Sequence, residues 1–222
     1  FDAATGTFTP EREEPYRYDL GPVSQVLCPS GFYDERTDRN LFLTMSRTGM
    51  SAQERLDSGW TNVMTLFKEI YLDDEGNVCF APIEEYQLLY DECLIDTSGE
   101  YTVEQANDLL STVGDDMLKI CVEIDPAEDS EVGLYVKCEL GGGEYVEISY
   151  EREKQLFYTS AARSSTAMRN NGAGGGTVAV EGNLLFTVYV DRAMVEISRR
   201  YSDTINRRLP TASKCSVREK RQ

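Results

Sequence analysis

The sequence predicts an all-β fold that contains a two-layer β-sandwich. Apolar residues alternate with polar ones in almost every apolar segment, which is the pattern of half-buried strands. Turn-forming residues separate these segments at 73–77, 141–143 and 170–172. Only 103–110, which follows Thr102, has the pattern of a helix, and this segment is short. Strands are therefore expected to form the core.

Strands are expected along the whole chain. Two hairpin-like strands are expected around Phe32 and over 41–45. Seven more are expected at 117–124, 132–140, 145–150, 155–159, 177–180, 184–190 and 194–198. The alternation is clearest at 184–197, where a polar Asp191-Arg192 pair interrupts the apolar pattern. Seven strands at this spacing over about 130 residues suit two packed sheets.

The chain is expected to divide near the turn at 73–77. Residues 1–72 are too few for a complete barrel or propeller, and we interpret them as the end of a larger domain. Residues 73–210 are the predicted sandwich, in which the glycine-rich segment 166–176 is expected to be a surface loop. Residues 211–222 are basic and are expected to form a disordered tail. Because the first residue is Phe1 rather than Met, an upstream portion is expected.

The composition excludes several classes of function. The chain has 222 residues, of which 22 are basic and 39 acidic, for a net charge of −17. Nucleic acids and anionic membrane surfaces need Lys and Arg to neutralise phosphate, so neither is an expected partner. A neutral substrate such as a sugar is compatible with this charge. Histidine is absent, which excludes Ser-His, Cys-His and His-ligated metal chemistry within the chain.

We predict no metal and no cofactor. The six cysteines form no C-x-x-C pair, so a structural zinc site is not expected. The acidic run 123–131 is interpreted as a solvated turn rather than a calcium loop. The chain contains no N-x-[ST] sequon, which slightly favours a cytoplasmic over a secreted setting.

Five strings, in order along the chain, carry a resemblance to a known family. Residues 27–34, LCPSGFYD, are similar to Y-A-P-Q-T-F-Y-D, and residues 39–45 lie where R-R-I-L-W-G-W would follow. Residues 59–70, GWTNVMTLFKEI, resemble G-W-x-G-x-x-S-L-P-R-E-L. Residues 82–89, PIEEYQLL, resemble P-V-x-E-L-x-x-L, and 191–197, DRAMVEI, resemble D-R-x-x-V-E-[VIF]. The patterns that these segments resemble are those of glycoside hydrolase family 32, which comprises the invertases, inulinases and levanases.

The resemblance implies a β-sandwich preceded by the remnant of a five-bladed β-propeller. The implied activity is hydrolysis of β-fructosidic bonds in sucrose or fructans, with retention through a fructosyl-enzyme. The catalytic carboxylates of the family lie in N-D-P-N-G, R-D-P and E-C-P, and none of these strings occurs here. Glu92-Cys93 is followed by Leu94 instead of proline. We therefore predict that this chain is not catalytic by itself.

The resemblance also implies roles for particular residues. Ser30, Leu43 and Met45 replace the Gln of A-P-Q and the two Trp of W-G-W, and are expected at the rim of the sugar pocket. Six residues are expected to be structural: Trp60, Glu69, Glu85, Asp191, Arg192 and Glu196. Trp60 is interpreted as a core anchor between blade and sandwich, with a sugar-stacking platform as the alternative. Asp191 and Arg192 are interpreted as a satisfied pair at a bulge or turn.

Two functions follow. The first is the C-terminal portion of a β-fructosidase-like glycoside hydrolase, with the upstream propeller portion of the same protein and a sugar or fructan as partners. The alternative is a non-catalytic module, either a carbohydrate-binding or an oligomerisation β-sandwich. A homo-oligomer formed through the sandwich is possible in either case. Neither function requires nucleic acid or a membrane.

Overall fold

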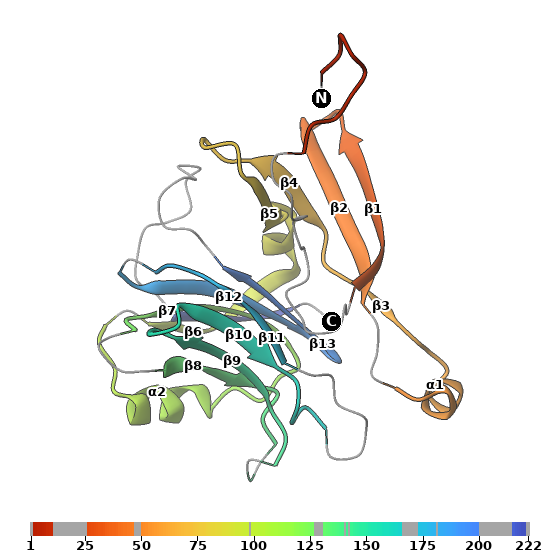
Figure 1. The fold of residues 1–222 in the computed structure, drawn as a ribbon. Helices are drawn as coiled ribbons and strands as arrows, with labels where there is room; N and C mark the ends of the chain where they lie inside the picture. The colour runs from red at the N-terminus through yellow and green to blue at the C-terminus, as the bar shows by residue number, and fades with distance from the viewer. Residues whose placement is uncertain are drawn as a thin grey trace.

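Three antiparallel sheets form the framework of the computed structural model (Figure 1). The structure describes residues 2–10, 26–46, 50–97, 99–126, 131–139, 141, 143–165, 173–180, 182–199 and 215–220. Helices are limited to two short α-helices and one 3-10 helix within these ranges. The prediction of an all-β fold is confirmed.

The first sheet is an up-and-down arrangement in which each main strand pairs with the next. Its order is β1-β2-β4-β5, with the short β3 paired to β2 beside β4. These strands are β1 (Val26–Asp34), β2 (Arg39–Ser46), β3 (Val63–Met64), β4 (Lys68–Leu72) and β5 (Val78–Pro82). Helix α1 (Ala52–Ser58) lies in the connection from β2 to β3. The division expected near residue 73 falls inside this sheet, because β5 pairs with β4.

Aspartates fix the two hairpin turns of the first sheet. Asp34 accepts hydrogen bonds from the Thr37 hydroxyl and the Arg36 N–H. Asp73 accepts from the side-chain amide of Asn77 and from the backbone N–H groups of Asn77 and Glu75, and this bonding lowers the pKa of Asp73. Such side-chain bonds to the following backbone are why Asp favours turns. The turn signal at 73–77 therefore marks a real turn, between β4 and β5.

The other two sheets form the sandwich. One has the order β11-β10-β9-β8 and the other β13-β12-β7-β14-β6. The strands of the first are β8 (Glu131–Val136), β9 (Val146–Glu151), β10 (Leu156–Ser160) and β11 (Ala173–Thr177). Those of the second are β6 (Tyr90–Thr97), β7 (Met117–Ile124), β12 (Leu184–Asp191), β13 (Met194–Arg199) and β14 (Cys215–Lys220). The 3-10 helix η1 (Glu84–Leu89) leads from β5 into β6.

The core lies between the two sheets of the sandwich. Ile148 and Tyr150 of β9 meet Phe186 and Val188 of β12, and all four side chains are almost completely buried. The Phe186 ring lies 5.8 Å from the ring of Phe157 on β10. Helix α2 (Val103–Leu110) adds leucines to this core and begins with a capping box between Thr102 and Gln105. The helix expected at 103–110 is confirmed.

Several strands differ from the sequence-based expectation. Strands β5 and β6 were not predicted, β11 covers part of the segment expected to be a loop, and the strand expected at 177–180 is a strand only at Thr177. Strand β11 forms because glycine allows a close approach to β10: a Cβ on Gly175 would lie 2.5 Å from the Phe157 carbonyl oxygen. Residues 215–220 form β14, paired with β6 and β7, where a disordered tail was expected. Backbone pairing does not require an apolar pattern, so composition alone missed β14.

We expect Phe186→Ala to lower the free energy of unfolding by about 3–5 kcal/mol, because it empties a large aromatic site in the core. Chemical denaturation followed by circular dichroism would measure the change. Leu88→Ala is the matched control, since Leu88 is exposed on η1 and its truncation should cost less than about 0.5 kcal/mol. Equal effects of the two substitutions would contradict this placement of the core.

Candidate functional site

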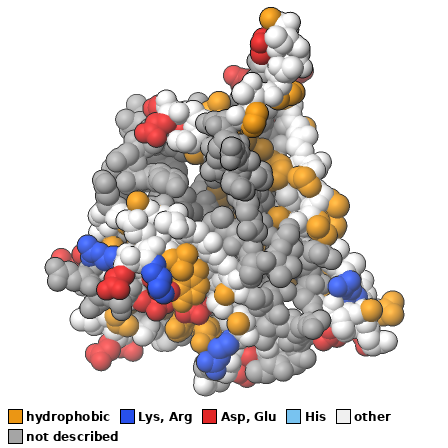
Figure 2. All heavy atoms as spheres, viewed as in Figure 1, with side chains coloured by type: hydrophobic (Ala, Val, Ile, Leu, Met, Phe, Trp, Pro, Cys, Tyr) orange, Lys and Arg blue, Asp and Glu red, His pale blue; other side chains and the backbone are white. Residues whose placement is uncertain are grey.

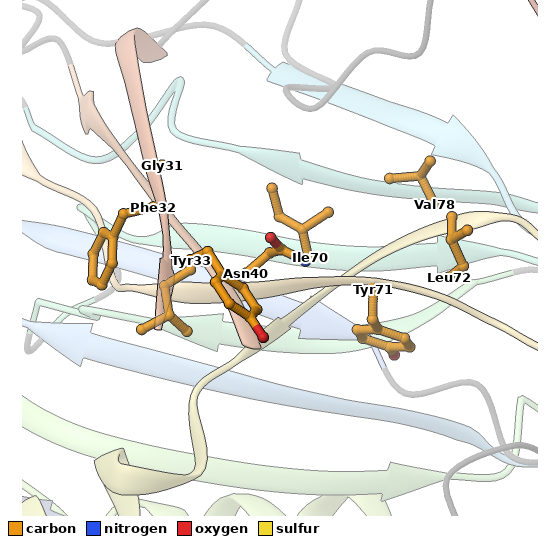
Figure 3. A pocket seen from close by; sticks show the side chains of 9 residues that line it. Gly31, Phe32, Tyr33, Asn40, Ile70, Tyr71, Leu72 and Val78 are labelled. Atoms are coloured by element: carbon orange, nitrogen blue, oxygen red, sulfur yellow. The ribbon is translucent and has the colours of Figure 1, made fainter. Parts of the chain in front are cut away.

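The first sheet carries an open depression of about 470 Å³. Figure 3 shows Phe32 and Tyr33 at one end, Tyr71 and Leu72 at the other, and Ile70 between them. The lining is mainly apolar and contains no carboxylate. Retaining hydrolysis of a glycosidic bond needs two carboxyl groups about 5–5.5 Å apart. The depression can therefore contact a ligand but cannot supply this chemistry.

The three residues predicted at the pocket rim lie on β1 and β2, next to the depression but not in its lining. Ser30 is exposed and pairs across the strands with Leu43. Leu43 and Met45 are two positions apart on β2, so they share one face, and both are half-buried. The structure thus brings the three residues together on neighbouring strands. Their contact with a sugar remains a prediction.

The first sheet and the sandwich are joined through Glu196. This carboxylate, on β13, accepts a hydrogen bond of 2.5 Å from the backbone N–H of Leu66. It also forms a 2.5 Å ion pair with the ammonium of Lys68 on β4. The two charged side chains are only 12% and 14% exposed. A pair removed from water to this degree depends on both partners, because either charge alone would be poorly solvated.

A second set of polar contacts involves η1. The Tyr86 hydroxyl accepts a hydrogen bond of 2.6 Å from the Phe67 N–H. The guanidinium of the buried Arg39 donates to both carboxylate oxygens of Glu85. This bonding lowers the pKa of Glu85 and raises that of Arg39, with the nearby charge of Glu69 contributing to the latter. Helix η1 is therefore bonded to β2 and to the segment that enters β4.

The ring of Tyr189 is the centre of the apolar part of this contact. Tyr189 lies on β12 and is buried, with the rings of Tyr86 and Tyr90 at 6.2 and 6.4 Å. The ammonium of Lys119 lies 5.9 Å from the same ring and donates to Gln87 of η1. Burial raises the pKa of Tyr86, and raises that of Tyr90 to about 12. These tyrosines are therefore neutral at physiological pH.

Trp60 does not fill a core site in this structure, contrary to the expected role as an anchor. It directly follows the Gly59 cap of α1 and keeps 40% of its surface exposed. Helix α1 buries none of its residues and projects away from the three sheets (Figure 1). The glycine and tryptophan instead mark the end of α1.

Asp191 and Arg192 lie where β12 turns into β13, and a turn is one of the two settings expected for them. Asp191 is the last residue of β12 and pairs with Met194 of β13. Arg192 takes a left-handed backbone with φ 53°, and its N–H donates to the Asp116 carbonyl at 2.8 Å. A two-residue turn between paired strands requires such a conformation. This turn sets the register that places Glu196 opposite Tyr189.

Sequence reasoning missed most partners in the contact. Lys68 and Arg39 pair with Glu196 and Glu85 over 128 and 46 positions of sequence, so no local signal marks them. Tyr86 and Gln87 follow Glu85 directly in PIEEYQLL and could have been suspected from that string. Among the described residues, no group of three or more His, Cys, Asp or Glu side chains could hold a metal ion. The described helices are all too short or too polar to span a membrane.

Comparison with known proteins identifies the family. The family model described as glycosyl hydrolases family 32, C terminal, matches residues 85–197, which is about half of the chain. The chain belongs to this family. The match begins within η1 at Glu85 and ends on β13 just after Glu196, so it contains the residues with which the sandwich meets the first sheet.

Solved structures of family 32 enzymes share the fold. An exo-inulinase from Aspergillus awamori matches with a TM-score of 0.70 at 14% identity, over 99% of this chain and 47% of its own. Fructan 1-exohydrolase IIa from Cichorium intybus matches with a TM-score of 0.67 at 13% identity, over 92% of this chain and 49% of its own. Sucrose-6-phosphate hydrolase from Lactobacillus gasseri matches with a TM-score of 0.69 at 12% identity, over 91% of this chain and 43% of its own. This chain therefore spans about half the length of these structures.

One curated protein also matches by sequence. Bromodomain-containing protein 9 from Mus musculus is 26% identical over 138 residues, which is 55% of this chain and 22% of that protein. At this identity and coverage, the match does not show a shared family.

We expect Glu196→Gln to lower the free energy of unfolding by about 2–4 kcal/mol, because it leaves the largely buried ammonium of Lys68 without its carboxylate. Equilibrium denaturation would measure this loss. Glu92→Gln is the control, since Glu92 is exposed on β6, and we expect less than about 0.5 kcal/mol there. If Glu196→Gln also costs less than about 0.5 kcal/mol, the ion pair does not stabilise the contact.

The Arg39–Glu85 pair should make stability depend on pH at the acidic end. The pKa of Glu85 is lower in the folded chain than in the unfolded one, because Arg39 donates to its carboxylate. The resulting stability is present above the unfolded pKa and is lost as the pH falls through the folded pKa. Thermal denaturation between about pH 6 and pH 3 should therefore show a smaller loss in Glu85→Gln than in the wild type. Glu84→Gln, an exposed neighbour on η1, should keep the wild-type profile.

Proposed function

We propose that this chain is the C-terminal portion of a β-fructosidase-like glycoside hydrolase, acting on sucrose or fructans with retention. In this proposal the chain is structural and forms part of the pocket rim, and it does not perform the chemistry. The polar contact around Glu196 and Glu85 carries the proposal, because it joins the first sheet to the sandwich within the stretch that the family model matches. Membership in family 32 supports the substrate class.

We propose that the first sheet is the last blade of a propeller whose other blades belong to the same protein. Support comes from its four main strands, which pair in chain order as the strands of a propeller blade do. Large apolar side chains are exposed on it, namely those of Phe32, Tyr33, Met64 and Leu72. Figure 2 shows hydrophobic side chains spread along the side of β1 and β2. Exposed apolar groups in such number are typical of a surface that another element covers.

The proposed division between blade and sandwich lies between β5 and η1. Strand β5 still pairs within the first sheet, whereas η1 leads directly into β6 of the sandwich. On this division the proposed pocket rim, Ser30, Leu43 and Met45, belongs wholly to the blade. Without flat aromatic side chains at positions 43 and 45, the rim would meet a sugar through aliphatic and hydroxyl groups.

An assay of two proteins tests the proposal. The 222-residue chain alone should release no fructose from sucrose, inulin or levan, because its described residues hold no pair of carboxylates at the depression. A longer natural protein that includes the upstream portion should release fructose, as measured by chromatography of the products. Turnover by the purified chain alone, or a longer protein that lacks the three carboxylate motifs, would sink the proposal.

A further inference from the structure

The outer face of the β8–β11 sheet has an unusual set of side chains. Strand register places Gly133, Ser149, Tyr158 and Gly175 in one row across the four strands. Three of these four residues are small, so the only large side chain in the row belongs to Tyr158. The next row places Tyr135 beside Glu147. The opposite face of the same sheet carries Ile148 and Tyr150 into the core.

Tyr158 lies flat on this face. It belongs to β10, yet its hydroxyl donates at 2.8 Å to Glu131 on β8, which is two strands away, and lies 3.1 Å from Glu147 on β9. Neighbouring strands are about 4.8 Å apart, so the ring must extend along the sheet, over β9, to make the longer contact. The small Ser149 and Gly133 leave room for it. One face of the ring therefore rests on the sheet and the other faces outward.

A second aromatic surface lies beside the first. The rings of Tyr135 and Tyr145 are stacked with their centres 4.6 Å apart and an angle of 27° between them. The Arg163 guanidinium lies 5.0 Å from the Tyr145 ring centre and donates to its hydroxyl at 3.3 Å. Tyr145 covers one face of the Tyr135 ring, and yet 55% of Tyr135 is exposed. The uncovered face of Tyr135 is therefore open to solvent.

We propose that this outer face binds a neutral oligosaccharide. The rings of Tyr158 and Tyr135 stack against the apolar faces of sugar residues, while Glu147 and Glu131 accept hydrogen bonds from hydroxyl groups and Arg163 donates to them. Sugars combine an apolar C–H face with a rim of hydroxyls, which matches flat rings bordered by charged groups. Fructan chains are the first choice of ligand because of the family to which the chain belongs.

Other classes of ligand fit this face less well. An anion or a nucleic acid would meet two carboxylates on a chain of net charge −17. A purely apolar partner would bury Glu131, Glu147 and Arg163 without replacing the water that solvates them. A cationic partner would be repelled by Arg163 beside the stacked rings. A neutral polyhydroxylated ligand avoids each of these costs.

This site is separate from the proposed catalytic portion. The sheet that contains β12 lies between the β8–β11 sheet and the first sheet: its Phe186 side faces the core, and its Tyr189 side faces η1 (Figure 1). The outer face of the β8–β11 sheet is therefore on the far side of the sandwich from the pocket rim. Binding there would hold a polymer near the protein without occupying the rim. The proposal goes beyond hydrolysis and does not require the chain to belong to an active enzyme.

Affinity electrophoresis and isothermal titration calorimetry of the 222-residue chain test the site, with inulin, levan and a cello-oligosaccharide as probes. We expect binding of inulin or levan, weakened at least about tenfold by Tyr158→Ala and by Tyr135→Ala. Tyr158→Phe keeps the ring and removes only the hydroxyl contacts to Glu131 and Glu147, so it should retain most of the affinity. Tyr101→Ala is the matched control, because Tyr101 is 47% exposed and lies just before α2. Thermal denaturation establishes that each variant is folded; Tyr135→Ala alters an exposed side chain and serves if Tyr158→Ala does not fold.

Three results would overturn the proposal. They are failure of the wild-type chain to bind any of the three probes, equal weakening by Tyr101→Ala, and self-association that Tyr135→Ala abolishes in a chain that binds no sugar. The last would identify the face as an interface between copies. Failure here would leave the proposed function intact, since that depends on fructose release by the longer protein. Conversely, loss of fructose release with retained binding would affect only the proposed function.

Discussion

Strand β12 is covered on both faces, and the arrangement of the three sheets depends on this. Phe186 and Val188 point into the sandwich core, while Tyr189 on the other face meets the rings of Tyr86 and Tyr90. A strand covered on both sides cannot expose either set of side chains without loss of apolar burial. The first sheet is held on the second face by polar contacts, of which the ion pair of Glu196 is the most buried. The hairpin at Arg192 places Glu196 for this contact, so a short turn determines how two layers meet.

The sequence predicted correctly those elements that are determined by their own residues. Strands β12 and β13 alternate clearly, the Asp73 turn carries its own hydrogen-bond acceptor, and α2 begins with a capping box. Strands β11 and β14 were not found because their pairing is made by the backbone of neighbouring strands. Glycine at position 175 looked like a loop signal, although it is what permits the close approach to β10. Periodicity detects burial on one face, and it gives no signal for pairing made by the backbone alone.

The candidate site shows a similar division. The family resemblance drew attention to Glu85 and Glu196, and the structure places both in contacts that join separate elements. It could not give their partners, because Arg39 and Lys68 become neighbours only after the sheets pack. For Trp60 the expected environment was wrong. A large aromatic residue in an apolar segment was expected in a core, and it instead lies partly exposed just beyond α1. Burial depends on where an element packs, which the residue type alone does not determine.

The charged side chains on the two outer faces of the sandwich differ in how far they are exposed to water. This difference distinguishes a permanent contact from a reversible one. At Glu196 and Lys68 both charges are largely removed from water, and each has its partner within the chain, so neither needs a further ligand. On the β8–β11 sheet, Glu131 and Arg163 remain exposed, and Tyr135 keeps one face of its ring open. Groups that stay hydrated can exchange water for the hydroxyls of a ligand at little cost. The first face is suited to a permanent contact between the sheets, and the second to the reversible binding that we propose for it.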